Sequence, residues 1–127
     1  MKQDENEELE RIAQHVEMLE DYQRNLEQQI MDVQQLIASL EEFSTLKGGE
    51  TILLPLAHGI FAKGTLVDKD HLVVHVGSDV AVTKTVAETK ALLTTQLEEM
   101  DAYYERTAAR VADLVKRAEE IDASKFK

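Results

Sequence analysis

Residues 48–85 carry the sequence GGETILLPLAHGIFAKGTLVDKDHLVVHVGSDVAVTKT. Apolar residues alternate with polar ones through much of this segment, and glycines and polar turn residues divide it into four pieces. A period of two is typical of β-strands. The segment therefore predicts strands at 51–56, 60–67, 71–76 and 80–84, paired as two consecutive hairpins.

The first of these strands differs from the others because its apolar run is almost unbroken. Residues 51–56 read TILLPL, which favours burial on both faces of the strand. Pro55 has no backbone N–H to donate, so it indicates a sheet edge or a bulge at that point.

The segments on either side of the hairpins have the apolar period of a coiled coil. In the first arm the core positions are Leu9, Ile12, Val16, Leu19, Gln23, Leu26, Ile30, Val33, Ile37 and Leu40. In the second arm they are Val86, Lys90, Leu93, Leu97, Met100, Tyr104, Thr107, Val111, Leu114, Ala118 and Ile121. Because the chain must reverse direction between the arms, we expect an antiparallel pair with the two apolar seams facing each other.

Local signals predict where the two helices begin and end. The first helix is expected over most of residues 5–45, with Gly48 and Gly49 providing its C-cap and the turn that follows. Thr85 is a suitable N-cap for the second helix, with Glu88 as its capping-box partner, and this helix is expected to run to about Asp122.

The predicted fold class is α+β, a long antiparallel two-helix coiled coil joined by two β-hairpins. We expect a single domain, residues 1–127, made of a helix (1–46), a double hairpin (47–84) and a second helix (85–127). Two hairpins of this size leave strand edges unpaired and cannot bury their apolar faces alone. Other subunits are therefore expected to supply the missing strands.

The charge of the chain is strongly and unevenly acidic. Its net charge is −11 over 127 residues, and residues 1–46 alone hold 12 acidic and 3 basic residues, a net charge of −9. Nucleic-acid binding depends on Lys and Arg, so it is not expected. The acidic arm has two interpretations: it solvates an exposed helix, or it attracts a basic partner.

Targeting signals and membrane spans are not expected. The N-terminus MKQDENEELE is polar and acidic, unlike a signal peptide, and no apolar run approaches the roughly 18 residues that would suggest a membrane span. The chain contains no cysteine, so disulfides and thiolate sites are excluded. These features predict a cytoplasmic protein without a membrane partner.

Catalytic and cofactor motifs are not recognisable in the sequence. His71 and His75 would point the same way on a strand, but no third ligand with suitable spacing accompanies them. Acidic pairs such as Glu98-Glu99 lie on helix surfaces, and phosphate-binding loops and nucleophile elbows are missing. We therefore expect no enzyme activity, cofactor or metal.

The free end of the coiled coil, opposite the hairpins, is the candidate binding surface. A two-helix coil has no further layer to cover its end, so the apolar residues there are expected to be only partly hidden. They are Leu9, Ile12, Val16, Leu19, Leu114, Val115, Ala118, Ile121 and Phe126. This set indicates either a surface that binds non-native polypeptides or simple fraying of the helix ends.

The order helix, double hairpin, helix resembles the alpha class of prefoldin subunits. The resemblance is most specific in two stretches of the centre, GETILLPL at 49–56 and LVVHVGSDVAVTKT at 72–85. Two hairpins rather than one distinguish the alpha class from the beta class.

The resemblance implies a heterohexamer of two alpha-class and four beta-class subunits, whose hairpins form a double β-barrel platform. Family members capture unfolded chains at the tips of their coiled coils without ATP and pass them to a group II chaperonin. Carried onto this sequence, the subunit interface would comprise Ile52, Leu54, Leu56, Ile60, Leu66, Leu72, Val74, Val76, Val80 and Val82. The client-contact residues would be the set at the free end.

Two functional hypotheses follow. The leading one is an ATP-independent chaperone subunit that holds unfolded proteins through several weak apolar contacts. The alternative is a structural or adaptor subunit of a prefoldin-like scaffold, which binds specific folded partners.

Overall fold

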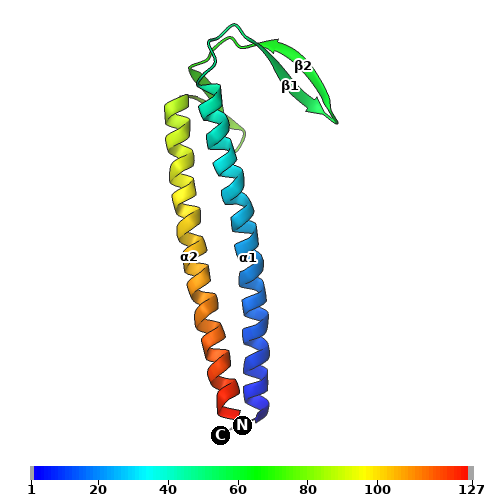
Figure 1. Ribbon diagram of the computed structural model, residues 1–127, viewed down its shortest axis with the longest axis vertical. Coiled ribbons are helices and arrows are strands. Elements are labelled where there is room, and N and C mark those ends of the chain that lie inside the picture. The colour runs from blue at the N-terminus through cyan, green and yellow to red at the C-terminus, as the bar shows by residue number, and fades with distance from the viewer. Residues whose placement is uncertain (1, 126–127) are drawn as a thin grey trace. The chain divides into compact units, whose positions relative to one another are not determined.

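The computed structural model describes residues 2–125 and contains two helices and four strands. In chain order these are α1 (Lys2–Phe43), β1 (Thr51–Ala57), β2 (Ile60–Thr65), β3 (His71–Gly77), β4 (Val80–Thr85) and α2 (Val86–Lys125) (Figure 1). The expected order of elements is confirmed, and every strand boundary lies within two residues of its prediction. The chain forms two compact units, one of Met1–Asp32 with Leu97–Lys127 and one of Val33–Gln96.

The outer unit, Met1–Asp32 with Leu97–Lys127, is an antiparallel two-helix coil. The start of α1 and the end of α2 lie together at its free end (Figure 1). A cluster of Ile12, Leu114 and Ile121 is buried near that end, and Leu26 is buried further along α1. These residues belong to the predicted seams, which confirms the heptad assignment in this unit.

Two polar residues in the predicted seam, Thr107 and Lys90, have partners for their side chains. The buried Thr107 hydroxyl donates to the Tyr103 carbonyl oxygen at 2.8 Å. In the inner unit, Val33–Gln96, Lys90 Nζ forms an ion pair with Glu41 Oε1 at 2.9 Å. Because each polar group is paired, these positions interrupt the apolar stripe without leaving a buried donor unsatisfied.

A hydrogen bond also links the two helices of the outer unit. The Tyr104 hydroxyl donates to Glu27 Oε1 at 2.7 Å. This hydrogen bond to the carboxylate raises the pKa of Tyr104, because the bond is lost when the hydroxyl ionises.

The end of α1 differs from the expected glycine cap. The helix ends at Phe43, and the Ser44 and Thr45 hydroxyls donate to the carbonyls of Glu41 and Glu42. These bonds satisfy carbonyls of the last turn, which have no partner further along the helix. Gly48 and Gly49, with φ of 80° and 74°, instead bend the connection that leads into β1.

Both hairpins close through two-residue loops, His58-Gly59 and Ser78-Asp79. All four loop residues have positive φ, between 48° and 78°, which is the pattern of a type I′ turn. The strand register shifts beside each loop, between Pro55 and Ala57 in the first hairpin and between His75 and Gly77 in the second. Pro55 was expected at a sheet edge or a bulge, and it lies beside this register shift in a strand of a two-stranded sheet.

The register brings apolar residues to one face of each hairpin. In the first, Ile52 pairs with Gly64 and Leu54 with Ala62; in the second, Val74 pairs with Val82. Gly64 leaves room for Leu54, since a Cβ at Gly64 would lie 3.1 Å from Leu54 Cδ1.

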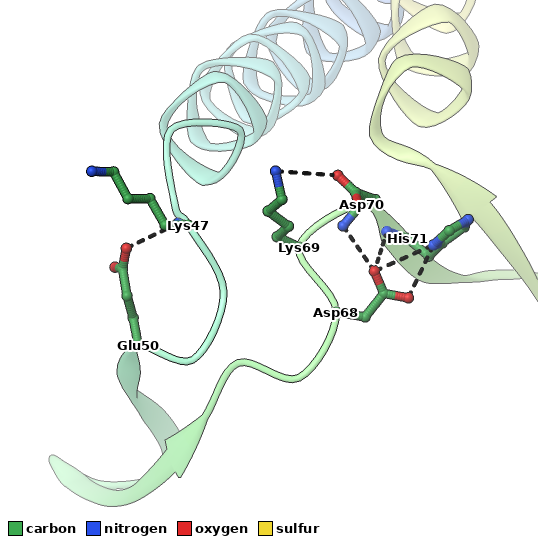
Figure 2. Close-up of polar contacts among 6 residues, drawn as sticks. All are labelled: Lys47, Glu50, Asp68, Lys69, Asp70 and His71. Atoms are coloured by element: carbon green, nitrogen blue, oxygen red, sulfur yellow. Dashed lines mark hydrogen bonds and ion pairs between the residues drawn. The ribbon is translucent and has the colours of Figure 1, made fainter.

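Hydrogen bonds organise the connection between the hairpins (Figure 2). The Asp68 carboxylate accepts the backbone N–H groups of Asp70 and His71 at 2.9 and 3.1 Å, and His71 Nδ1 lies 2.9 Å from Asp68 Oδ2. These bonds, chiefly the one from the Asp70 N–H, lower the pKa of Asp68. Nearby, the buried Leu66 exchanges backbone hydrogen bonds with Gly49 and Glu50.

The predicted capping box at the start of α2 is confirmed. The Glu88 N–H donates to the Thr85 hydroxyl at 3.0 Å, and the Thr85 N–H donates to Glu88 Oε1 at 3.3 Å. Two hydrogen bonds lower the pKa of Glu88. The bond from the Thr85 backbone has the larger effect, and the bond to the Thr85 side chain has the smaller one. Because Thr85 also ends β4, this box joins the second hairpin to α2.

Replacing the N-cap tests the importance of this junction. We expect Thr85→Ala to lower the free energy of unfolding by about 1 kcal/mol, because the first turn of α2 loses a side-chain acceptor. Urea denaturation of the native assembly, followed by circular dichroism, measures the effect. Thr95→Ala, in the exposed interior of α2, is the matched control and should not destabilise the protein. Equal stability of the Thr85 variant and the wild type would contradict the role of the cap.

The same box predicts a pH dependence. The pKa of Glu88 is lowered from its ordinary value of 4.5, so the stabilisation is present above that pH and is lost as pH falls through the folded-state pKa. In Thr85→Ala the pKa of Glu88 should rise part of the way back, because the side-chain bond is removed while the backbone bond remains. Carboxyl-carbon NMR titration measures this change, and Asp68, which has different partners, should titrate unchanged as the internal control.

Candidate functional site

The predicted binding residues at the free end are more deeply packed than expected. Ile12, Leu114 and Ile121 are only 8%, 9% and 5% exposed, so the expectation of partial exposure is wrong for these three. Each fills the seam between the helices and contacts the opposite apolar stripe. They hold the end of the coil together, and their role in binding stays a prediction.

The other predicted residues at this end are more accessible. Leu9, Val16, Leu19 and Ala118 are half-buried against the cluster, while Val115 is 41% exposed. Phe126 lies outside the residues that the structure describes. Among the described residues, Val115 is therefore the most exposed member of the set.

An apolar groove of about 380 Å³ lies along one flank of the coil. It is lined from α1 by Leu9, Ile12, Ala13 and Val16, and from α2 by Val115, Ala118, Glu119 and Asp122. We call it the Val115 groove. Ala13 was missing from the predicted set because it lies beside the heptad stripe, and its small side chain helps to leave the space open.

The opposite flank of the same coil is polar and bridged. Arg117 Nε lies 3.2 Å from Glu8 Oε1, so an ion pair crosses from α2 to α1. The residues near this ion pair on the same flank include Asp4, Glu5 and Glu120. The two flanks of the coil therefore present different chemistry to solvent.

The hairpins expose half of the ten apolar side chains that were predicted to form a subunit interface. Leu54, Leu56, Ile60, Val76 and Val80 are exposed, whereas Ile52, Leu72, Val74 and Val82 are half-buried and Leu66 is buried. Leu53 and Phe61, on the other face of the first hairpin, are 61% and 56% exposed. They were not in the predicted set, although the unbroken apolar run of the first strand indicated that both of its faces would be covered.

A larger apolar groove, of about 610 Å³, lies within the inner unit. Its walls come from β3, from Leu36 and Leu40 of α1, and from Leu92 and Leu93 of α2. Leu72, Val74 and Val76 of the predicted interface contribute to it. Apolar surface in the inner unit is thus concentrated on and beside the hairpins.

Within residues 2–125 the structure brings together no group of three or more metal-ligating side chains. His71 is paired with Asp68. No helix in that part of the chain is long and apolar enough to cross a bilayer.

Comparison with known proteins identifies the family. A family model described as prefoldin subunit matches residues 12–124. The prefoldin subunit alpha of Pyrococcus horikoshii is 32% identical over 124 residues, covering 91% of this chain and 84% of that protein. The chain belongs to the prefoldin family.

Further relatives of the chain are also alpha-class prefoldin subunits. The prefoldin subunit alpha of Thermofilum pendens is 28% identical and covers 91% of this chain and 95% of its own length. A cryo-EM structure of filamentous prefoldin from Methanocaldococcus jannaschii has the same fold, with a TM-score of 0.84. The match covers 94% of this chain and 98% of the matched chain, and the two sequences are 21% identical. The predicted alpha-class assignment and fold class are confirmed.

Membership of the family defines the general role of the chain. Prefoldins are chaperones, generally without enzymatic activity, so this chain is a chaperone subunit. Prefoldin alpha subunits form oligomeric complexes with other prefoldin subunits, and the hairpins form the barrel with those subunits. The exposed apolar faces of β1–β4 have the composition that such an assembly requires.

Proposed function

We propose that this prefoldin subunit captures unfolded polypeptides at the free end of its coiled coil, without ATP, and delivers them to a group II chaperonin. The observation that carries the proposal is the Val115 groove, an apolar surface at the free end of the coil. The chain that presents it belongs to a chaperone family. Unfolded chains expose the apolar side chains that such a groove can bind.

Several weak contacts are expected to act together in client capture. The Val115 groove is shallow, and a single site of this size provides little apolar area. An assembly that presents several coils to one flexible client raises the effective concentration at each further site. Affinity then comes from the number of coils engaged rather than from the depth of any one groove.

We propose that the partners in this assembly are beta-class prefoldin subunits, four of them with two alpha subunits, in the cytoplasm. The proposal is supported by the family and by the exposed apolar residues of both hairpins. Each hairpin is a two-stranded sheet, so its outer edges have backbone groups that can pair with a neighbouring strand. All residues of the predicted interface lie on these strands except Leu66, which follows the end of β2.

A charge placed on a hairpin should disrupt this assembly. Leu54 is 47% exposed and faces the same side as Ile52, so Leu54→Glu would bury a carboxylate in the proposed interface. We expect loss of the hexamer, measured by native mass spectrometry after co-expression with a beta-class subunit. Val67→Glu is the matched control, because Val67 is 93% exposed and lies outside the predicted interface. Intact assembly of the Leu54 variant would argue against the interface.

Removal of the free end should separate assembly from client capture. A chain lacking residues 1–14 and 115–127 is expected to assemble through its hairpins but to lose suppression of client aggregation, because the truncation removes most of the Val115 groove. Light scattering with two unrelated denatured proteins measures this effect, and native mass spectrometry checks assembly. Undiminished protection by the truncated assembly would exclude the free end as the client site.

The same assay distinguishes the adaptor alternative. An adaptor would bind one folded partner tightly and would give no protection to assorted unfolded proteins. Protection of both unrelated clients by the wild-type assembly is the result that supports the chaperone proposal.

A further inference from the structure

The two flanks of the outer coil differ in what covers the seam. On one flank, the Glu8–Arg117 ion pair crosses between the helices over the seam. On the other flank, the positions facing each other across the Val115 groove carry Ala13 and Val115, which have no charge and cannot form such a bridge. Solvent and ligands can therefore reach the apolar seam from this second flank.

The charged residues that line the Val115 groove have one sign. They are Glu119 and Asp122, both exposed on α2. Among residues 3–124, whose side chains the structure describes, neither carboxylate has an ion-pair partner, in contrast to Glu8 on the bridged flank. The groove thus combines an apolar floor with two available negative charges on its rim.

The arm that supplies the α1 wall of the groove is also acidic. Residues 1–46, which supply the α1 wall of the groove, have a net charge of −9. Such a field attracts cationic segments and repels anionic ones before contact is made. Lys and Arg suit the site itself as well, because their aliphatic stems pack on apolar surface while the charged group reaches a carboxylate.

We propose that the Val115 groove selects segments of unfolded polypeptide in which an apolar side chain is adjacent to Lys or Arg. The apolar side chain lies between Ala13 and Val115, and the cation pairs with Glu119 or Asp122. This inference rests on the proposed capture of unfolded chains and adds the class of segment that the site prefers.

Two fluorescent peptides test the selectivity. They share the same Leu, Val and Phe residues and differ only in flanking Lys or Glu, and their dissociation constants are measured by anisotropy with the complete native assembly. Exposed ion pairs are individually weak, so we expect the Lys peptide to bind about three- to tenfold more tightly at low salt. The preference should shrink as salt is added, because the charges are at the surface.

Matched variants assign the preference to the groove. Glu119→Gln with Asp122→Asn should reduce the Lys preference by at least about half. Glu98→Gln with Glu99→Gln removes the same charge from exposed positions of α2 outside the groove and should largely retain the preference. Equal loss in both double variants would assign the effect to overall charge and overturn the proposal.

A third comparison tests the apolar floor. Val115→Gln should weaken binding of both peptides while keeping their ratio, because it removes apolar area and no charge. Ala109→Gln, at an exposed position of α2 outside the groove, should have no effect. Unchanged binding by the Val115 variant would place the peptides elsewhere and overturn the proposal.

The wild-type results separate this inference from the proposed function. If the assembly protects denatured clients but binds the two peptides equally, or binds neither, charge selection in the groove is wrong and the chaperone function stands. If it protects no client, the proposed function itself fails.

Discussion

The packing of one apolar stripe against another is the constraint on which this structure depends. Each helix has a single stripe, so a coil of two helices can bury only the side chains at the seam. The most deeply buried of them, such as Leu26 and Ile121, are still 5% exposed to solvent, and no described side chain is less than 2% exposed. A coil of two helices has no further layer to cover the two flanks of the seam. The residues beside the seam therefore determine whether solvent can reach it from each flank.

Charged side chains bridge the two helices over the seam at some positions, and apolar side chains leave the seam accessible at others. Glu8 with Arg117 and Glu41 with Lys90 connect the helices across positions where apolar packing ends. Ala13 and Val115 provide no such connection, and the result is an accessible apolar surface on a chain of net charge −11. The coil therefore has one flank bridged by an ion pair and one flank with accessible apolar surface, which is where we propose that clients bind.

The junctions between elements depend on local hydrogen bonds, and one of the two helix caps could be predicted. The Thr85–Glu88 box was predictable because both residue types and their spacing of three are specific for an N-cap. The end of α1 was not, because the hydroxyls of Ser44 and Thr45 satisfied the last carbonyls before Gly48 was reached. Competition between two acceptable caps is decided by small energies that sequence patterns do not resolve.

Periodicity and turn chemistry, both visible in the amino-acid sequence, were enough to predict the two helices, the two hairpins and the seam residues, while the resemblance to the family rested on the stretches 49–56 and 72–85. These are local properties, since a stripe or a two-residue turn is specified by residues close together in the chain. The depth of burial of Ile12 and Leu114, and the groove between Ala13 and Val115, required the tertiary structure. Both depend on which residues of α1 meet which residues of α2, and that register is a property of the two helices together.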